Sequence, residues 1–519
     1  MKVARILITP LFILLFALAQ AQEAPVAKTE FGPVKGRLSV DGKVRIFLGI
    51  PFAAPPVGAL RWKPPQPPAP WTDTRDATSY GSRCMQAGLF KVEFLDPGPS
   101  EDCLTLNVWA PKGASRLPVL VWIYGGGFLD GGSSEPRTSG ENLAHRGVIL
   151  VSMNYRLNVF GFFATHELEA ESPHHAAGNY GLLDQSAAIH WVQKNIAEFG
   201  GDPGKITIFG ESAGSFAVSA QMASPLTRDL IAGAIGESGG GLARSSVPFP
   251  DLASKEKEDE KFAKNALHAE NLAALRAMSA ADLAAKAAPK LIGGGKFTPN
   301  IDGYFLTETL PATFSAGKQA HVPLLAGWNA DESFVSAAKI PGFGPQNLNG
   351  MLMQKFGLRS FEAAKYFPAA NNEQAIQSAD DLSAAEFLVY GTWAWLEAHV
   401  KTGSSPAYRF YFDLGVPVGP GQEGPGRAFH SDEVDYVFGT LDTRKGTKWR
   451  PEDYALSEKM QTYWTNFAKT GDPNSVGLPK WPAYSAADNW LVMHLDATPA
   501  AQPDEHRERF MFLQKVWNK

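Results

Sequence analysis

Short apolar runs recur along the chain and alternate with segments in which apolar residues return at helical spacing. The run LPVLVWIY at 117–124 is almost continuously apolar, which is typical of a parallel strand covered on both faces. Similar runs predict strands at 104–109, 148–153, 205–209, 231–235, 322–325, 407–412 and 490–495. Helical spacing is clearest at 185–199, where Gly200 and Gly201 end the pattern. Strands interleaved with helices indicate an α/β protein with a large, mostly parallel sheet.

The remaining segments are expected to form short strands and helices that are added to this sheet. Residues 28–48 alternate like short strands separated by turns. The segment 251–290 is charged and rich in alanine, as surface helices are, and 340–400 contains further helical pattern. A single α/β domain over 22–519 with helical insertions is therefore the simplest organisation.

The first 21 residues are predicted to be a signal peptide. Lys2 and Arg5 precede a mostly apolar stretch from Ile6 to Leu18, and Ala19-Gln20-Ala21 has the small residues of a cleavage site. An uncleaved anchor is the alternative, but the stretch is short and contains a proline. No later apolar run is long enough to cross a bilayer. We therefore expect a secreted or periplasmic protein with no integral membrane segment after cleavage.

The charge and the cysteine content indicate which partners and which covalent cross-links to expect. The net charge of the 519 residues is −5 and no basic block is present, which argues against nucleic acid as a partner. The only two cysteines are Cys84 and Cys103. In an oxidising compartment an isolated pair is more often bridged than free, two reduced buried thiols being the alternative.

The chemistry centres on the stretch KITIFGESAGSFAVSAQMA at 205–223. Strand, sharp turn and helix form the context in which G-x-S-x-G is a nucleophile elbow, so Ser212 is the predicted nucleophile. A second match places Ser238 after an apolar run, but glycines and a proline follow it and no helix is predicted there. Ser238 is expected at a strand end in a glycine loop, and it and Glu211 are candidates for supporting the site.

A serine needs a base, and in this architecture the acid and then the histidine follow the nucleophile along the chain. Among the eleven histidines, His430 differs because it follows a Gly/Pro loop, whereas His399 and His494 lie in helical and strand patterns. The acid is expected in the loop after the strand at 322–325. Asp331 and Glu332 both stand there, and position alone does not choose between them.

The developing oxyanion of an acyl transfer needs N–H donors. Gly125-Gly126-Gly127 ends a buried strand and allows close approach of backbone to substrate, and the N–H of Ala213 directly follows the nucleophile. The glycine triplets at 239–241 and 293–295 are interpreted as ordinary loops. No H-E-x-x-H, C-x-x-C, P-loop or dinucleotide pattern occurs in a fitting context, so neither metal nor cofactor is expected.

These features occur within longer stretches that are similar to one family. The chain resembles the type-B carboxylesterases, which include bacterial para-nitrobenzyl esterases, cholinesterases and neuroligins. The resemblance covers nearly the whole mature chain and is carried by LGIPFAAPPVGALRWKPPQP (48–67), SEDCLTLNVWAP (100–111), VLVWIYGGGF (119–128), NYRLNVFGF (154–162), GNYGLLDQ (178–185), WVQKNIAEFGGDPGKITIFGESAG (191–214), GWNADES (327–333) and AFHSDEVDYVFG (428–439).

The resemblance implies an α/β-hydrolase fold and a role for each site residue. It assigns Ser212 as nucleophile, Glu332 as acid, His430 as base, Gly126, Gly127 and Ala213 as oxyanion donors, and a disulfide between Cys84 and Cys103. The family usually has glycine after its acid, and here Ser333 stands there.

The expected activity is that of a serine carboxylesterase hydrolysing neutral esters through an acyl-enzyme, with no cofactor and a small ester as partner. One alternative is an esterase dedicated to a bulky feruloyl or mycotoxin ester. Another is a non-catalytic adhesion module, which the family also contains, but all three triad residues are present here. The sequence leaves the natural substrate and the oligomeric state open.

Two sequence features bear on substrate choice. In cholinesterase relatives, a tryptophan in the loop closed by the first disulfide binds the choline ammonium. Here that loop has Phe90, Phe94 and Lys91 but no tryptophan, and Gly239 to Gly241 provide no side-chain wall after Ser238. We expect a roomy pocket for neutral short-to-medium acyl or aryl esters, unless Phe90, Phe94 or an aromatic residue from the segment 340–400 replaces the tryptophan.

Overall fold

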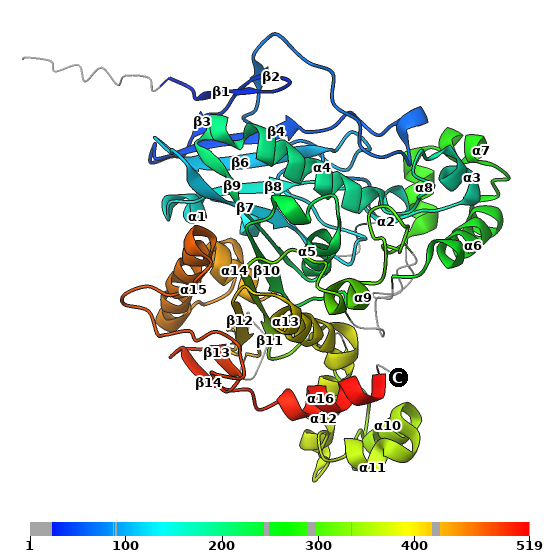
Figure 1. The fold of residues 1–519 in the computed structure, drawn as a ribbon, viewed down its shortest axis with the longest axis vertical. Helices are drawn as coiled ribbons and strands as arrows, with labels where there is room; N and C mark the ends of the chain where they lie inside the picture. Colours follow the sequence, from blue (N-terminus) through cyan, green and yellow to red (C-terminus); the bar gives the residue numbers. More distant parts are fainter. Residues whose placement is uncertain are drawn as a thin grey trace, which may run out of the picture.

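The computed structural model of the protein describes residues 23–86, 88, 91–242, 249–288, 297–333, 335–417 and 426–517. The predicted signal peptide at 1–21, Phe90 and the glycine triplet at 293–295 lie outside the described residues. A sheet of 11 strands runs through the molecule, and a separate three-stranded sheet packs near the N-terminal end of the described chain (Figure 1). The small sheet consists of β1 (Val26–Thr29), β2 (Gly32–Lys35) and β5 (Arg75–Asp76).

The large sheet is parallel in its centre and antiparallel at both edges. Its spatial order is β14 (Ala500–Pro503), β13 (Leu491–Leu495), β12 (Ala407–Phe412), β11 (Leu324–Asn329), β10 (Gly233–Glu237), β9 (Gly201–Glu211), β7 (Leu117–Ile123), β8 (Ile149–Met153), β6 (Thr105–Pro111), β4 (Val44–Pro51) and β3 (Arg37–Leu38). The strands from β13 to β8 pair in parallel, whereas β14, β6, β4 and β3 pair antiparallel to their neighbours. The predicted mostly parallel sheet is confirmed.

Burial explains why the apolar runs form this sheet. Every residue of β7 except its first is buried, as expected for a strand covered on both faces. The predicted strand at 322–325 needs a correction, because β11 begins at Leu324 and continues to Asn329. Its extra length follows from pairing with β12, where Trp328 is opposite Tyr411 and Asn329 is opposite Phe412.

Helices cover both faces of the sheet. Figure 1 shows α1 (Glu141–His145), α14 (Glu433–Phe438) and α15 (Pro451–Thr470) on one side, and α4 (Tyr180–Asn195), α5 (Ala213–Ala223) and α13 (Tyr390–Thr402) on the other. The helix predicted at 185–199 is α4 followed by a short 3₁₀ turn, and Gly200 ends it with a φ of 83°.

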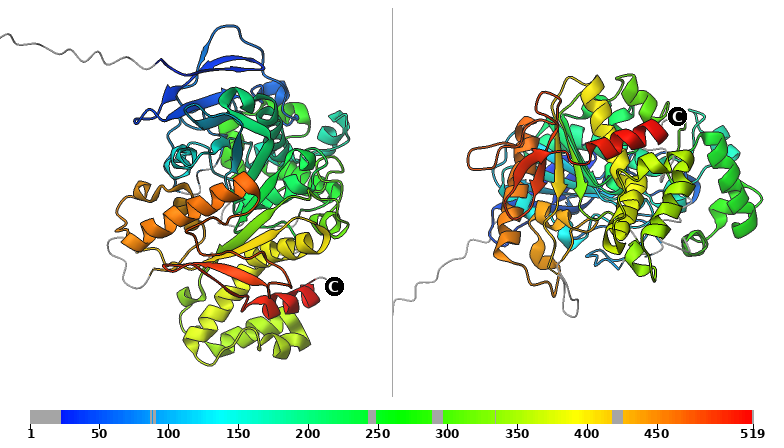
Figure 2. Two further views of the ribbon diagram at one scale, coloured as in Figure 1. Left: turned by 60° about the vertical axis from the view of Figure 1, so that its left-hand side comes forward. Right: turned by 90° about the horizontal axis from the view of Figure 1, so that it is seen from below.

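The predicted helical insertions form two outer groups. One contains α3 (His166–Glu171), α6 (Leu252–Phe262), α7 (Leu272–Ala277) and α8 (Ala280–Ala287), with α2 (Asn158–Gly161) next to it. The other contains α10 (Pro345–Phe356), α11 (Ser360–Ala363), α12 (Asn372–Ala384) and α16 (Arg507–Trp517), while α9 (Leu310–Ser315) lies beside α13 (Figure 2). Among the described helices, none combines the length and apolar character needed to cross a bilayer.

The topology brings three loops to one edge of the sheet. In a parallel sheet the carboxyl ends of neighbouring strands lie together, and there the connecting loops carry ligands and chemistry. Strand β9 lies between β10 and β7, so the turn that follows it sits at the centre of this edge. The glycine loop follows β7, and the loop with Asp331 and Glu332 follows β11.

Candidate active site

Ser212 occupies a strained turn between β9 and α5. Its backbone has φ 55° and ψ −123°, a conformation that residues other than glycine rarely adopt. Only glycine fits at position 214, because a Cβ there would lie 2.0 Å from the carbonyl oxygen of Ile123. The N–H of Ser212 donates to the carbonyl of Glu237 at 2.8 Å, which fixes the turn against β10. The serine hydroxyl is thereby presented at the N-terminus of α5.

A chain of hydrogen bonds connects three of the predicted site residues. The Oγ of Ser212 lies 3.0 Å from Nε2 of His430, and Nδ1 of His430 lies 2.6 Å from Oε2 of Glu332. His430 stands in the loop between β12 and α14, with 20 % of its side chain exposed, whereas Glu332 is buried. Residues 212, 332 and 430 are therefore brought together from three separate loops.

The structure shows different partners for Asp331 and Glu332, the two acidic residues between which position in the sequence does not choose. Glu332 faces His430, while Asp331 accepts from Nη1 of Arg427 at 2.9 Å. The hydroxyl of Ser333 donates to Oδ1 of Asp331 at 2.6 Å. Serine in place of the usual glycine therefore contacts Asp331 and leaves the Glu332 carboxylate directed at the histidine.

Ser238 lies at a strand end and forms a hydrogen bond with Glu332. It follows β10 directly, no helix begins in the described residues 239–242, and its hydroxyl donates to Oε1 of Glu332 at 2.6 Å. The same Oε1 accepts the N–H of Asn329 at 2.8 Å. With His430 on its other oxygen, the Glu332 carboxylate is fixed in orientation by three donors.

The glycine loop at 125–127 approaches Ser212 closely. A Cβ on Gly125 would lie 3.0 Å from Cβ of Ser212 and 2.7 Å from a carboxylate oxygen of Glu211. Gly126 has a φ of 91°, which favours glycine, and a Cβ there would meet the Asp130 carbonyl oxygen at 2.0 Å. In the part of the chain that the structure describes, no acceptor engages the N–H of Gly126 or Gly127. Both residues, with Ala213, line the cavity at Ser212.

Glu211 adds a second carboxylate beside the imidazole. Its Oε1 lies 3.2 Å from Nε2 of His430 and accepts the hydroxyl of Ser431 at 2.5 Å. Burial raises the pKa of Glu211. Burial lowers the pKa of His430, but the carboxylates of Glu211 and Glu332 outweigh it and raise the pKa from 6.5 to about 9. The site is thus built to stabilise an imidazolium.

Two further buried acids, Glu237 and Glu433, were not predicted from the sequence. Trp464 donates to Glu237 at 2.7 Å, and Asn329 donates to Glu433 at 2.5 Å. Burial raises the pKa of Glu237 to about 8 and raises that of Glu433 well above its ordinary value. Each retains one oxygen without a hydrogen-bond partner among the described residues. Their only sequence signal is position: Glu237 precedes Ser238, and Glu433 follows His430 by three residues.

A cavity of about 600 Å³ opens over Ser212 and His430. Lys91 and Phe94, from the loop closed by the disulfide, line it together with the glycine loop and Phe387. This size lies in the range of small-molecule sites. Ser212 and the glycine loop therefore line one space that can hold a small ester.

The prediction about Gly239 to Gly241 was wrong in its reason. None of the three belongs to the described lining of the cavity. A Cβ on Gly239 would lie 2.5 Å from the carbonyl oxygen of Ser212, and one on Gly240 would lie 2.6 Å from that of Gly391. Glycine is needed at 239 and 240 because neighbouring backbone packs closely against both residues. The glycines therefore do not indicate the size of the cavity.

Cys84 and Cys103 form the predicted disulfide, with an S–S distance of 2.04 Å. Both cysteines are buried, and the chain contains no others. The bridge closes the base of the loop that carries Lys91 and Phe94.

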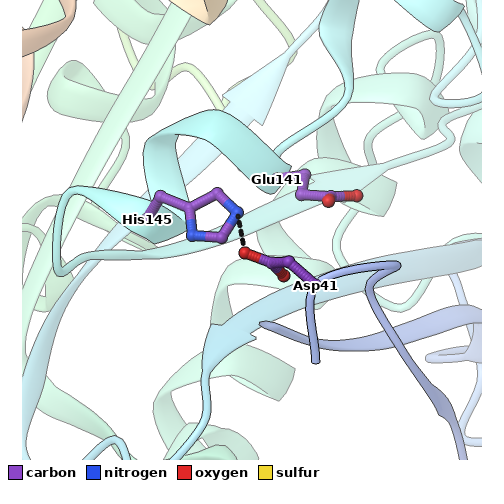
Figure 3. Close-up of side chains that lie close together, drawn as sticks. All are labelled: Asp41, Glu141 and His145. Atoms are coloured by element: carbon purple, nitrogen blue, oxygen red, sulfur yellow. Dashed lines mark ion pairs between the residues drawn. The ribbon is translucent and has the colours of Figure 1, made fainter. Parts of the chain in front are cut away.

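Among the described residues, two groups of surface side chains could each offer three ligands to a cation. Asp41, Glu141 and His145 form one group, with ligand atoms within 4.8 Å of one another (Figure 3). The second consists of His166, Glu169 and Glu256. In Figure 3 an ion pair joins Nε2 of His145 to Asp41 at 3.5 Å. These side chains are exposed or half-buried, and no further feature around them points to a bound ion.

Comparison with known proteins places these features in a family. The model of the Carboxylesterase family matches residues 23–512. The chain is 36 % identical to fumonisin B1 esterase of Sphingopyxis macrogoltabida over 482 residues, 88 % of this chain and 84 % of the relative. It is 34 % identical to para-nitrobenzyl esterase of Bacillus subtilis (strain 168), with 94 % and 99 % of the two chains covered.

Solved structures agree with the sequence relatives. A PNB esterase structure superposes with a TM-score of 0.79 at 33 % identity, covering 95 % of this chain and 100 % of the other. The sheet and the elbow are those of the α/β-hydrolase fold. Within that fold class the chain belongs to the carboxylesterase family and is a serine hydrolase of carboxylic esters.

Proposed function

We propose that Ser212, His430 and Glu332 are the catalytic triad of this esterase. The observation that carries the proposal is the chain of hydrogen bonds from Ser212 through His430 to Glu332, which begins at the floor of the cavity. His430 takes the proton of the Ser212 hydroxyl as that oxygen attacks the ester carbonyl. Glu332 holds the ring by its other nitrogen and stabilises the imidazolium that forms.

The glycine loop completes the reaction. Gly126, Gly127 and Ala213 line the cavity beside Ser212, and their N–H groups are the donors that we assign to the tetrahedral oxyanion. His430 then returns its proton to the leaving alcohol, which departs and leaves an acyl group on Ser212. A water molecule, deprotonated by His430, attacks that acyl group, and collapse of the second tetrahedral intermediate releases the acid and restores the serine.

The substrates are neutral esters with short-to-medium acyl or aryl groups. The cavity volume supports this class, and Lys91 on its wall disfavours a cationic alcohol. Phe94 does not offer an unoccupied ring to a cation, since the guanidinium of Arg83 already lies 4.5 Å from its centroid. Phe90 lies outside the described residues, and Phe387, from the segment 340–400, also lines the cavity. The relatives are named for very different esters, so their names support the reaction class rather than one substrate.

Export of the protein is part of the same proposal. Residues 1–21 act as a cleaved signal peptide and 22–519 form one catalytic domain. The Cys84–Cys103 bridge supports export, since such bridges persist in oxidising compartments. The strands of the large sheet, which come from positions between 37 and 503, support a single domain.

Covalent labelling tests the assignment of the nucleophile. A fluorophosphonate probe reacts with an activated serine, and peptide mass spectrometry locates the modified residue. We expect a single label on Ser212, and p-nitrophenyl butyrate added beforehand should slow its formation. Labelling of Ser238 alone, or equal labelling of several serines, would contradict the proposal.

A further inference from the structure

The side chain of Gln86 joins the loop closed by the disulfide to the glycine loop. Its Nε2 donates to the carbonyl oxygen of Gly131 at 2.7 Å, and its Oε1 accepts the N–H of Gly131 at 3.1 Å. The side-chain amide thus pairs with Gly131 as a neighbouring strand would. A third bond, from Nε2 to the carbonyl of Cys84 at 3.0 Å, orients the amide from its own side.

Gly131 is coupled to the oxyanion donors by a tight turn. The carbonyl oxygen of Gly126 accepts the N–H of Leu129 at 3.0 Å and that of Asp130 at 3.2 Å. Asp130 precedes Gly131, and its Oδ1 accepts the N–H of Gly88 at 3.1 Å. Segment 126–131 is therefore folded on itself, so a shift of Gly131 changes the peptide planes at Gly126 and Gly127.

The opposite side of this segment is already in close contact. A Cβ on Gly131 would lie 2.5 Å from the ring of Tyr124, and one on Gly125 would lie 2.7 Å from the backbone oxygen of Glu211. The segment thus packs against the ring of Tyr124 and is hydrogen-bonded by Gln86, which belongs to the disulfide loop. Cys84, only two residues from Gln86, is fixed by its bridge to Cys103.

We propose that Gln86 is a positioning residue for the oxyanion hole: it holds the glycine loop so that the N–H groups of Gly126 and Gly127 face the developing oxyanion. Donors preorganised for that charge act mainly in the transition state, and misplacement by a few tenths of an ångström weakens them. The loss should consequently fall on kcat and leave ground-state binding nearly unchanged. This inference rests on the proposed function of Ser212 and the glycine loop.

Three variants test the role. Gln86→Met keeps the length and much of the volume of the side chain but removes both hydrogen bonds to Gly131, and Gln86→Ala removes volume as well. Gln66→Ala is the matched control, because the Gln66 amide is exposed and its Nε2 bonds only the carbonyl of Pro64. Rates are divided by the concentration of active sites, which is titrated with a fluorophosphonate. Unfolded protein in a preparation therefore does not lower the measured kcat.

We expect Gln86→Met and Gln86→Ala to lower kcat for p-nitrophenyl butyrate by about tenfold or more, with KM changed less than about threefold. A trifluoromethyl ketone, whose adduct with serine places an oxyanion in the hole, should bind more weakly by a similar factor. Gln66→Ala should match the wild type in both measurements.

Wild-type affinity of Gln86→Met for the trifluoromethyl ketone would overturn the inference, as would a kcat loss confined to Gln86→Ala, since only packing would then matter. Should Gln86→Met yield no folded protein, the inhibition constant of Gln86→Ala decides alone. The outcome is separable from the triad assignment: an active Ser212→Ala variant would refute the proposed function, whereas unchanged inhibition of the Gln86 variants would refute only this role.

Discussion

A carboxylate oxygen of Glu211 lies 3.2 Å from Nε2 of His430, the nitrogen that also lies 3.0 Å from Oγ of Ser212. His430 is therefore held between two carboxylates, with Glu332 on Nδ1 at 2.6 Å. This arrangement favours the protonated ring and makes the activity depend on pH in a defined direction.

The first prediction concerns the acid limb of kcat/KM. A protonated histidine cannot act as base, so activity rises as His430 loses its proton. Because the two carboxylates raise the pKa of His430 to about 9, the midpoint of this limb should lie above the ordinary value of 6.5. Glu211→Gln removes one negative charge, lowers the pKa and should move the limb to lower pH. Coincident limbs for wild type and variant, followed in a pH-stat, would show that Glu211 does not act on His430.

The second prediction separates the two neighbouring acids. Glu332→Gln should lower kcat by about a thousandfold or more, because an amide cannot stabilise the imidazolium. Asp331→Asn should cost far less, since Asp331 contacts Arg427 and Ser333 rather than His430. Rates with p-nitrophenyl acetate compare the two variants directly, and losses of equal size would undo the assignment of the acid.

The third prediction concerns substrate charge. Acetylcholine and 3,3-dimethylbutyl acetate have nearly the same shape but differ in charge. With Lys91 on the cavity wall and Arg83 on the Phe94 ring, the neutral ester should have the higher kcat/KM by about tenfold, or about 1.4 kcal/mol. A preference for acetylcholine would mean that another part of the cavity binds the ammonium group.

The fourth prediction concerns processing. Protein expressed with its natural N-terminus and exported should begin at or near Gln22, and N-terminal sequencing tests this. The denatured, unreduced protein should show no titratable thiol, because Cys84 and Cys103 are its only cysteines and are bridged. An intact Met1 in the exported protein, or two reactive thiols, would contradict this account of export.

The elements that position the site follow local patterns, which is why sequence reasoning found them. The apolar run at 117–124, the elbow around Ser212 and the glycines at 125–127 each determine their own backbone geometry. The extent of β11 was missed because it depends on pairing with β12, a contact between distant parts of the chain.

Side-chain pairing across the fold could not be predicted in the same way. Nothing in the local sequence says that Gln86 meets Gly131 or that Trp464 meets Glu237, since each pair joins separate segments. The raised pKa of His430 likewise depends on Glu211 facing the ring. The glycines at 239–241 show a different limit: the missing side chains do not leave open space, because the backbone of Ser212 lies against Gly239 and that of Gly391 lies against Gly240.

The nucleophile assignment is tested most directly by measuring the pre-steady-state burst and kcat/KM with p-nitrophenyl butyrate for Ser212→Ala and Ser238→Ala. Ser212→Ala should stay folded, lose the burst and fall in kcat/KM by about a thousandfold or more. Ser238→Ala loses one hydrogen bond to Glu332, worth about 1 kcal/mol, and should keep the burst with a loss of about fivefold to tenfold. A burst that survives in Ser212→Ala and vanishes in Ser238→Ala would contradict the account.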